Sequence, residues 1–152
     1  MHVDPDIEPN APRGRAVRGG TASLLAVIAV GGMIGAVVRH GLATAFPPSP
    51  HGFPWATFAV NVSGCLLIGV LMVLITEAWT APRLVRPFLG VGVLGGYTTF
   101  STYAVEVQQA VAAGAARTGL LYLAGTLVAA LAAVWSGMVL TRLVTGVHRS
   151  GG

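Results

Sequence analysis

Residues 95–102 read GGYTTFST, and they interrupt a stretch that is otherwise apolar enough to cross a membrane. Each of the two adjacent glycines weakens a helix by about 1 kcal/mol relative to alanine. The serine and threonine residues that follow bring polar groups to a depth where lipid offers no partner. Broken backbone at that depth is tolerated where it is buried in protein or lines a wet cavity, and transporters bind ions at such breaks. We therefore expect residues 95–102 to form the functional site of a membrane protein.

The composition also indicates an integral membrane protein. Of the 152 residues, 54% are hydrophobic and only 9% are charged, whereas a soluble domain carries about 25% charged residues. Cys65 is the single cysteine, so it cannot form an intrachain disulfide, and we interpret it as a small packing residue. The chain has no basic patch interleaved with aromatic residues, so we expect no nucleic-acid partner.

Four apolar runs, each near the roughly 20 residues that a bilayer requires, predict an all-α fold of four transmembrane helices. The third helix is expected to be broken near the membrane midplane, at residues 95–102. Arginines before the first run also suit a signal peptide, but that run lacks an Ala-x-Ala site and three more spans follow. The sequence predicts three parts: a disordered tail 1–20, a four-helix transmembrane domain 21–145 and a tail 146–152. The spans of the domain are expected at about 22–45, 53–78, 84–113 and 117–143.

Arginines predict the orientation of these spans. With four spans, both termini share one side, and seven of the nine arginines lie on that side; Arg39 and Arg117 lie on the other. The positive-inside rule then places both termini in the cytoplasm and the protein in the plasma membrane. Trp55, Trp79 and Tyr122 lie near span ends, which suits anchoring at the membrane interface.

Several polar residues lie within or next to the apolar runs. Asn61 either makes a hydrogen bond between helices or faces an ion path, and the sequence leaves both open. Arg39 either reaches the interface along its aliphatic stem or draws anions into a vestibule. Glu106 either marks a functional site or faces solvent beyond a short half-helix. Phe100 and Tyr103 share one helical face directly after the break, where their positive ring edges can contact an anion.

Enzyme chemistry has no support in the sequence. The four histidines, His2, His40, His51 and His148, are expected in tails or loops, without metal-ligand spacing to an acid or a cysteine. No nucleophile elbow, phosphate loop or carboxylate pair occurs. We therefore expect no enzyme activity. The pairs Gly31-x-x-x-Gly35 and Gly92-x-x-x-Gly96 predict close helix packing, either within one subunit or between subunits.

Three segments together resemble the CrcB/Fluc family of fluoride channels. They are Gly31-Gly32-x-x-Gly35-Ala36-x-x-Arg39, Thr57-x-x-Val60-Asn61-x-x-Gly64, and Gly95-Gly96-Tyr97-Thr98-Thr99-Phe100-Ser101-Thr102-Tyr103 with Glu106. The third segment is the one most specific to the family. The resemblance covers roughly residues 30–143, so only the tails fall outside it.

This resemblance implies an antiparallel, dual-topology dimer in the lipid bilayer, with two pores for passive fluoride export. It implies a structural sodium ion held by the main-chain carbonyls of Gly95 and Thr98. The fluoride path that it implies contains Arg39, Asn61, Phe100, Ser101, Thr102, Tyr103, Glu106, Tyr122 and Thr126.

The chain departs from the family pattern at a few positions. Tyr103 stands where phenylalanine is usual, and Ala56 replaces the glycine before Thr57. Tyr122 and Thr126 resemble the start of the family's track of hydroxyl residues on the last span, which Ala130 and Val134 shorten.

Two other classes of membrane protein fit the sequence less well. A small multidrug-type, proton-coupled exporter needs a carboxylate in its first span, and residues 22–38 contain none. A membrane scaffold would not need Asn61, Glu106 and the Gly-Gly pair together. The arginine bias suggests a subunit inserted in one direction, so the inverted partner is either a second copy or an oppositely biased paralogue.

Overall fold

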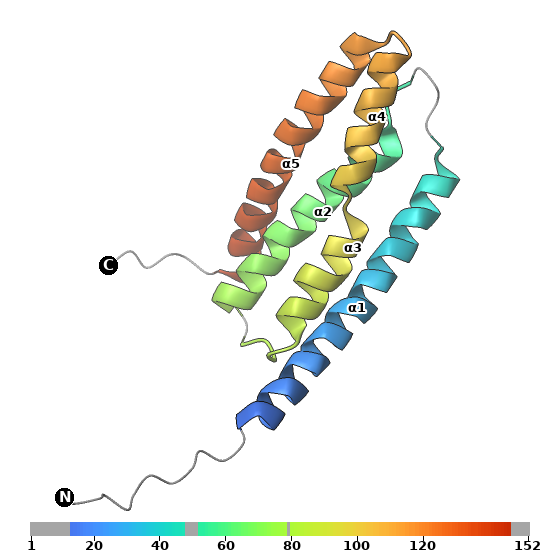
Figure 1. Cartoon of the computed structure of the whole chain (residues 1–152). Coiled ribbons are helices and arrows are strands. Elements are labelled where there is room, and N and C mark those ends of the chain that lie inside the picture. The colour runs from blue at the N-terminus through green and yellow to red at the C-terminus, as the bar shows by residue number, and fades with distance from the viewer. Residues whose placement is uncertain (1–12, 48–51, 79, 147–152) are drawn as a thin grey trace, which may run out of the picture.

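The computed structural model describes residues 13–47, 52–78 and 80–146, and every regular element within these ranges is helical. The predicted all-α class is confirmed. The chain runs back and forth along one bundle, and α1 begins at the same end of the bundle at which α5 ends (Figure 1). The elements are α1 (Arg13–Ala45), α2 (Trp55–Val73), η1 (Leu74–Ala78), η2 (Pro87–Leu94), α3 (Gly95–Tyr97), α4 (Phe100–Ala112) and α5 (Ala116–Thr145), of which η1 and η2 have the wider turns of a π-helix.

Glycines bring α1 against η2 and α3 at backbone distance. A Cβ added to Gly31 would lie 2.6 Å from Phe88 O, and one added to Gly92 would lie 2.9 Å from Ile28 O. Neither residue can therefore carry a side chain without moving the neighbouring helix. Gly35 faces Val93 and Gly96, so the two predicted glycine pairs pack helices of a single subunit.

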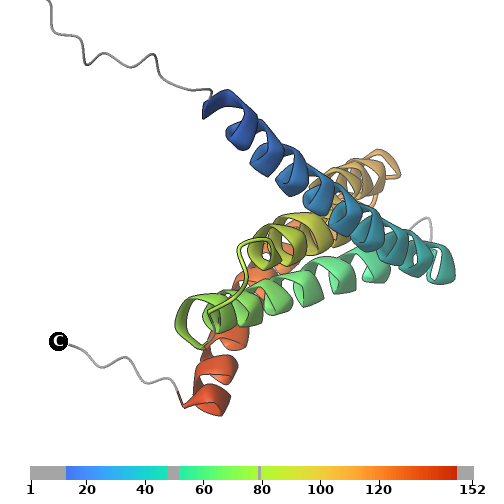
Figure 2. The same cartoon turned by 90° about the horizontal axis from the view of Figure 1, so that it is seen from below.

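A second glycine contact joins α2 to α5. Gly69 on α2 faces the carbonyl of Val134, and Gly137 on α5 faces the carbonyl of Leu66. The η2–α3 segment lies between α1 on one side and the α2–α5 pair on the other, as the view from below shows (Figure 2). The segment that carries the interruption is thus held between helices on two sides.

The helix boundaries differ from the predicted ones mainly at the N-terminus. The structure starts α1 at Arg13, within the range 1–20 for which the sequence predicts a tail. Extending an existing helix requires no new nucleation, and arginine and alanine are good helix formers, so the apolar span can continue outward past the membrane. Residues 1–12 and 147–152 lie outside the described residues, as does Trp79 with its predicted anchoring role.

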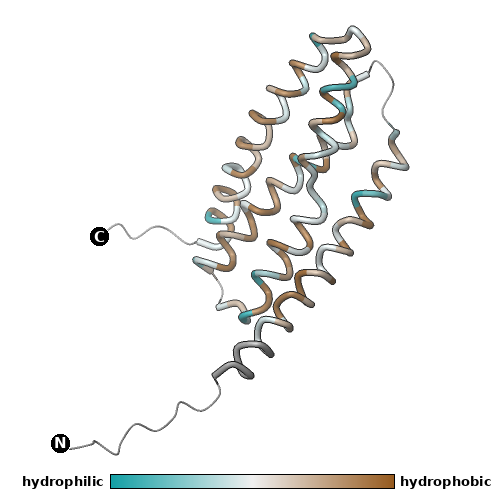
Figure 3. The backbone as a smooth tube through the Cα atoms, in the orientation of Figure 1, coloured by the Kyte–Doolittle hydropathy of each residue, from teal (hydrophilic) through white to brown (hydrophobic). Residues whose placement is uncertain are grey.

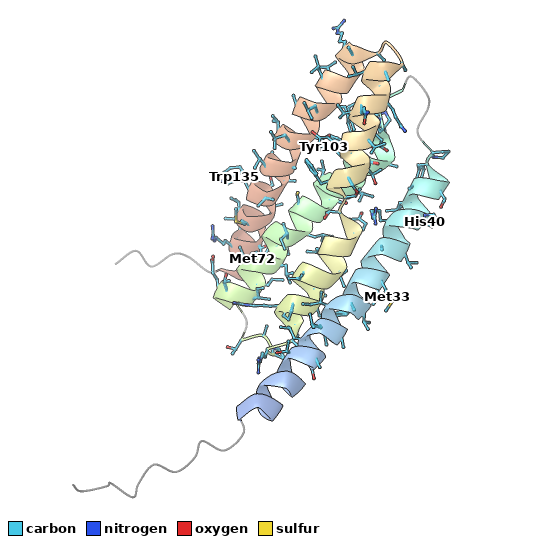
Figure 4. All side chains as sticks on the ribbon, in the orientation of Figure 1. Met33, His40, Met72, Tyr103 and Trp135 are labelled. Carbon is cyan, nitrogen blue, oxygen red and sulfur yellow. The ribbon has the colours of Figure 1, made fainter. Side chains whose placement is uncertain are left out.

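In the part of the chain that the structure describes, three helices are long and apolar enough to cross a membrane: Gly20–Ala45, Trp55–Ala78 and Ala116–Thr145. The remaining pass consists of η2, α3 and α4, none of which is long enough alone. Large apolar side chains cover the outside of the bundle, and Met33 and Trp135 point away from it (Figures 3 and 4). An apolar exterior of this extent identifies a multi-pass membrane protein.

Tyr122 corrects one sequence-based interpretation. It has 0% exposed surface and is the most completely buried large side chain among the described residues. The prediction that it anchors the chain at the membrane interface is therefore wrong, because its ring lies inside the bundle. Trp55, at the start of α2, is 67% exposed and remains a candidate anchor.

Candidate functional site

The chain leaves the helical conformation at Thr98 and Thr99, between α3 and α4. Thr98 has φ −79° and ψ 158°, and Thr99 has φ −146° and ψ 124°, so both are extended. Gly95 keeps helical angles, with φ −65° and ψ −35°. The helix therefore does not end at the two glycines, and Gly96 instead allows close packing against Gly32. The extended backbone begins one residue after Tyr97, at β-branched residues that favour it.

Asn61 of α2 binds this extended backbone through both ends of its amide. Its Nδ2 donates to Thr99 O at 2.9 Å, and Thr99 N donates to its Oδ1 at 2.8 Å. This reciprocal pairing also defines which end of the amide is nitrogen. Of the two interpretations left open by the sequence, the bond between helices is thus observed. One of the two Nδ2 protons is not used in it.

The extended backbone releases carbonyl groups that a continuous helix would use. Because Thr99 N donates to Asn61, it does not donate to Gly95 O, its helical partner four residues earlier. Gly96 O accepts a hydrogen bond from Arg39 Nε at 3.1 Å. The Arg39 side chain therefore reaches into the protein toward the interruption and does not extend away to the membrane interface.

Hydroxyl groups cap the start of α4. Thr99 Oγ1 accepts from Thr102 N at 3.2 Å and donates to Thr102 Oγ1 at 3.0 Å. This N-cap supplies an acceptor for a helical N–H that has no partner within the helix. Ser101 is exposed, and its Oγ lies 3.4 Å from Thr99 Oγ1, so it makes the weakest contact of the group.

Glu106 receives hydrogen bonds from two other helices. Thr57 Oγ1 on α2 donates to its Oε1 at 2.8 Å, and Tyr122 OH on α5 donates to its Oε2 at 2.7 Å. The carboxylate is part-buried within the bundle and does not face open solvent beyond a half-helix. Glu106 thus links α2, α4 and α5 just beyond the interruption.

Aromatic rings continue from the interruption into the bundle. The rings of Phe100 and Tyr103 have centroids 5.9 Å apart and are tilted by 52°. Tyr103 contacts Tyr122 edge to face at 5.1 Å, and its hydroxyl donates to Leu123 O at 2.7 Å. The extra hydroxyl at the position where phenylalanine is usual is therefore bound to backbone. Phe100 is 80% exposed in the isolated subunit.

Two cavities flank the extended backbone, and Thr99 lines both. The first, of about 260 Å³, is lined by Asn61, Cys65, Thr98, Thr99, Phe100, Tyr103, Thr126, Leu127 and Ala130. Thr126 is 5% exposed, and its Oγ1 has no hydrogen-bond partner among the residues that the structure describes. A buried hydroxyl without a partner is costly, so this one is available for an ion or water in the cavity.

The second cavity, of about 220 Å³, is lined by Arg39, His40, Ala43, Ala56, Thr57, Val60, Thr99 and Thr102. The structure thus brings most of the predicted site residues to the two cavities. Ser101 lines neither, and Glu106 and Tyr122 lie behind Thr57.

Sequence reasoning did not assign Thr99 or His40 to the site. The expectation that His40 lies in a tail or loop is wrong, because the residue lies within α1.

The described residues contain no group of three or more His, Cys, Asp or Glu side chains that could hold a metal ion. At the interruption, the described backbone offers an oxygen, Gly95 O, that lacks its helical donor.

These features define a class: a helical, multi-pass membrane protein with polar groups converging on an interrupted helix. A protein-family model described as "CrcB-like protein, Camphor Resistance (CrcB)" matches residues 26–138. A Streptomyces avermitilis protein named fluoride-specific ion channel FluC 2 is 58% identical over 125 residues, covering 82% of this chain and 79% of that protein.

A Nocardia farcinica protein with the same name is 53% identical over 127 residues, covering 84% of this chain and 91% of that protein. A Streptomyces coelicolor protein named fluoride-specific ion channel FluC 1 is 56% identical over 114 residues, covering 75% of this chain and 74% of that protein. The chain belongs to the CrcB family.

Proposed function

We propose that this chain is a subunit of a fluoride-specific channel and not an enzyme, and that it lets fluoride leave the cell passively. The observation that carries the proposal is the 260 Å³ cavity beside the interruption. In it, the buried Thr126 hydroxyl lacks a partner among the described residues, and Asn61 retains an unused amide proton. The names of the relatives support the same ion.

Fluoride is small and strongly hydrated, so its path must replace water with other donors. The Thr126 hydroxyl, the second Asn61 proton, and the ring edges of Phe100 and Tyr103 are such donors. All four groups are neutral. A full positive charge among them would hold the anion too tightly for rapid exit. The neutral lining therefore favours rapid conduction over tight binding.

A structural sodium ion fits the backbone at the interruption. Sodium is a hard cation that prefers oxygen ligands, and the chain offers the carbonyls of Gly95 and Thr98 at the turn. Gly95 O is left without its helical donor because Thr99 N binds Asn61. When bound, the ion supplies positive charge that stabilises the released carbonyls. Two carbonyls are too few for a complete shell, so the remaining ligands must come from outside this subunit.

A second subunit in inverted orientation would supply those ligands and cover the exposed Phe100 ring. We place the dimer in the plasma membrane, with the interruption near the bilayer midplane and both termini of this chain in the cytoplasm. The bias of arginines toward the side that holds both termini favours a single insertion direction for this chain. The partner is then either a minority of inverted copies or an oppositely biased paralogue.

The test is fluoride efflux from liposomes that contain the purified full chain. We expect release well above that from empty vesicles, with little release of chloride. Phe100→Ile and Asn61→Asp should slow it strongly. Phe46→Ile is the matched control, because Phe46 is also exposed but lies outside the 260 Å³ cavity. No fluoride release from protein that remains helical and monodisperse would overturn the proposal.

A further inference from the structure

His40 lines the second cavity beside Arg39, on the upper part of α1 in Figure 4. The opposite walls are Thr57 and Val60 of α2, and Thr99 and Thr102 at the start of α4. Because Thr99 also lines the 260 Å³ cavity, the two cavities meet at the same extended backbone. The cavity of about 220 Å³ therefore lies next to the proposed fluoride path, on the side where α1 ends.

The hydrogen bonds around this cavity leave few donors for an anion. The Thr57 hydroxyl proton is committed to Glu106, and the Thr99 hydroxyl proton to Thr102. Thr102 Oγ1 accepts that bond, and its own proton makes no hydrogen bond to the described residues. Arg39 donates from Nε to Gly96 O at 3.1 Å, and its terminal nitrogens make no hydrogen bond to the described residues.

We propose that His40 is a fluoride-binding residue at the entrance of the pathway. Its imidazolium form donates hydrogen bonds to the arriving anion together with Arg39 and Thr102. This inference rests on the proposed fluoride conduction. A neutral imidazole offers one N–H donor and one acceptor lone pair, whereas the imidazolium offers two donors and a positive charge. The doubly protonated ring is therefore the form that suits an anion.

Among the described residues, few charged or titratable groups face this cavity. Arg39 lies on the same helix, and α2 contributes Ala56, Thr57 and Val60, none of which titrates. Glu106 on α4 lies behind Thr57, and its two oxygens are bound by Thr57 and by Tyr122 of α5. The carboxylate is thus screened from the cavity by its own donors, and His40 is the one histidine among the described residues that line the cavity.

The rate at which fluoride arrives at this cavity should therefore depend on pH. The charge of histidine side chains changes between about pH 5 and 8. A second positive charge at the mouth raises the local anion concentration and the rate of encounter, and added salt weakens this effect. The effect concerns arrival and leaves the neutral donors of the 260 Å³ cavity unchanged, so it should lower the fluoride concentration for half-maximal rate without raising the maximal rate.

The experiment measures efflux from liposomes of neutral lipid, with the pH equal on both sides and release from empty vesicles subtracted. For the natural chain, we expect the rate at limiting fluoride to rise about three- to tenfold from about pH 8 to about pH 6. His40→Gln should remove this rise while keeping the rate found at the higher pH. His40→Arg should give the faster rate throughout.

His51→Gln is the matched control, because it removes the next histidine along the chain and should leave the pH profile unchanged. A profile in His40→Gln equal to that of the natural chain would overturn the assignment while leaving fluoride conduction intact. Loss of the profile in His51→Gln instead would also overturn it. An absence of efflux from the natural chain at every pH would reject the proposed function itself, so the two failures are distinct.

Discussion

Asn61 on α2 makes two hydrogen bonds to a single residue, Thr99, with distances of 2.9 Å and 2.8 Å. The pair replaces the bonds that the Thr99 N–H and carbonyl would make in a continuous helix. It therefore fixes the extended conformation at the point where the two cavities meet. The amide has a structural role at the interruption in addition to any contact with an ion.

Asn61→Asp should lower the free energy of unfolding by about 1–3 kcal/mol. The new oxygen replaces Nδ2, so it cannot donate to Thr99 O and instead repels it. Thermal or denaturant unfolding in detergent measures the loss. Thr44→Ala is the control, because its exposed hydroxyl binds only the backbone of its own helix. Equal stability of the two variants would show that the amide does not hold the interruption.

Thr126→Val should separate stability from conduction. Its hydroxyl has no partner among the described residues, so the isosteric valine should leave the unfolding midpoint unchanged or raise it. The same change removes a proposed fluoride donor and should slow efflux by about tenfold or more. Thr141→Val is the control, because that buried hydroxyl binds Gly137 O and lines neither cavity. Unchanged efflux in Thr126→Val would exclude this hydroxyl from the path.

The two buried tyrosines should respond differently to loss of their hydroxyl groups. Tyr122→Phe removes a donor from Glu106 Oε2 and should cost about 1–3 kcal/mol. Tyr103→Phe removes a donor from Leu123 O, which lies within α5, and should cost about 1 kcal/mol or less. Tyr103→Phe also keeps the ring edge, so efflux should persist. Unfolding midpoints and efflux of both variants test this order, and a larger stability loss in Tyr103→Phe would contradict it.

The sequence predicts the helical class because long apolar runs leave the backbone no alternative in lipid. It also predicts the location of the polar segment, since GGYTTFST has no equivalent elsewhere in the chain. The residues that leave the helix are Thr98 and Thr99, while the glycines remain helical. Glycine is weakly disfavoured in a helix, but here its small size serves the contact between Gly96 and Gly32.

Other features depend on contacts that no local pattern contains. Asn61 and Thr99 are 38 positions apart, so their pairing follows from the approach of α2 to the interruption. Tyr122 looks like an interfacial anchor from its place near a span end, yet Glu106 and the ring of Tyr103 surround it. The predicted span at about 22–45 already contains His40, so the separate expectation of a tail or loop for this residue conflicts with it.

The proposed sodium ion predicts a dependence of stability on the cation present. A ligand that binds only the folded protein stabilises it by about 2.7 kcal/mol at 100 times its dissociation constant. We therefore expect a higher unfolding midpoint in sodium chloride than in choline chloride at equal ionic strength. Choline is too large to fit among the carbonyls of Gly95 and Thr98. Equal midpoints across sodium concentrations would argue against the ion.

Gly137→Ala tests the packing that supports the site from the far side of α2. An added Cβ would overlap Leu66 O, which belongs to the helix backbone and cannot rotate away. The helices must then separate, which should cost about 1–3 kcal/mol. Gly41→Ala is the matched control, because nothing lies within 4 Å of its added Cβ, and a more helix-favouring residue there should raise stability by about 0.5–1 kcal/mol. Opposite shifts of the unfolding midpoint are expected for the same chemical change.

The same substitution should also affect conduction. Because α2 also carries Asn61, separation of α2 from α5 in Gly137→Ala should widen the gap between Asn61 and Thr126 and slow fluoride efflux. Gly41→Ala should conduct normally, and a Gly137→Ala protein with unchanged stability and efflux would show that this contact does not position the site.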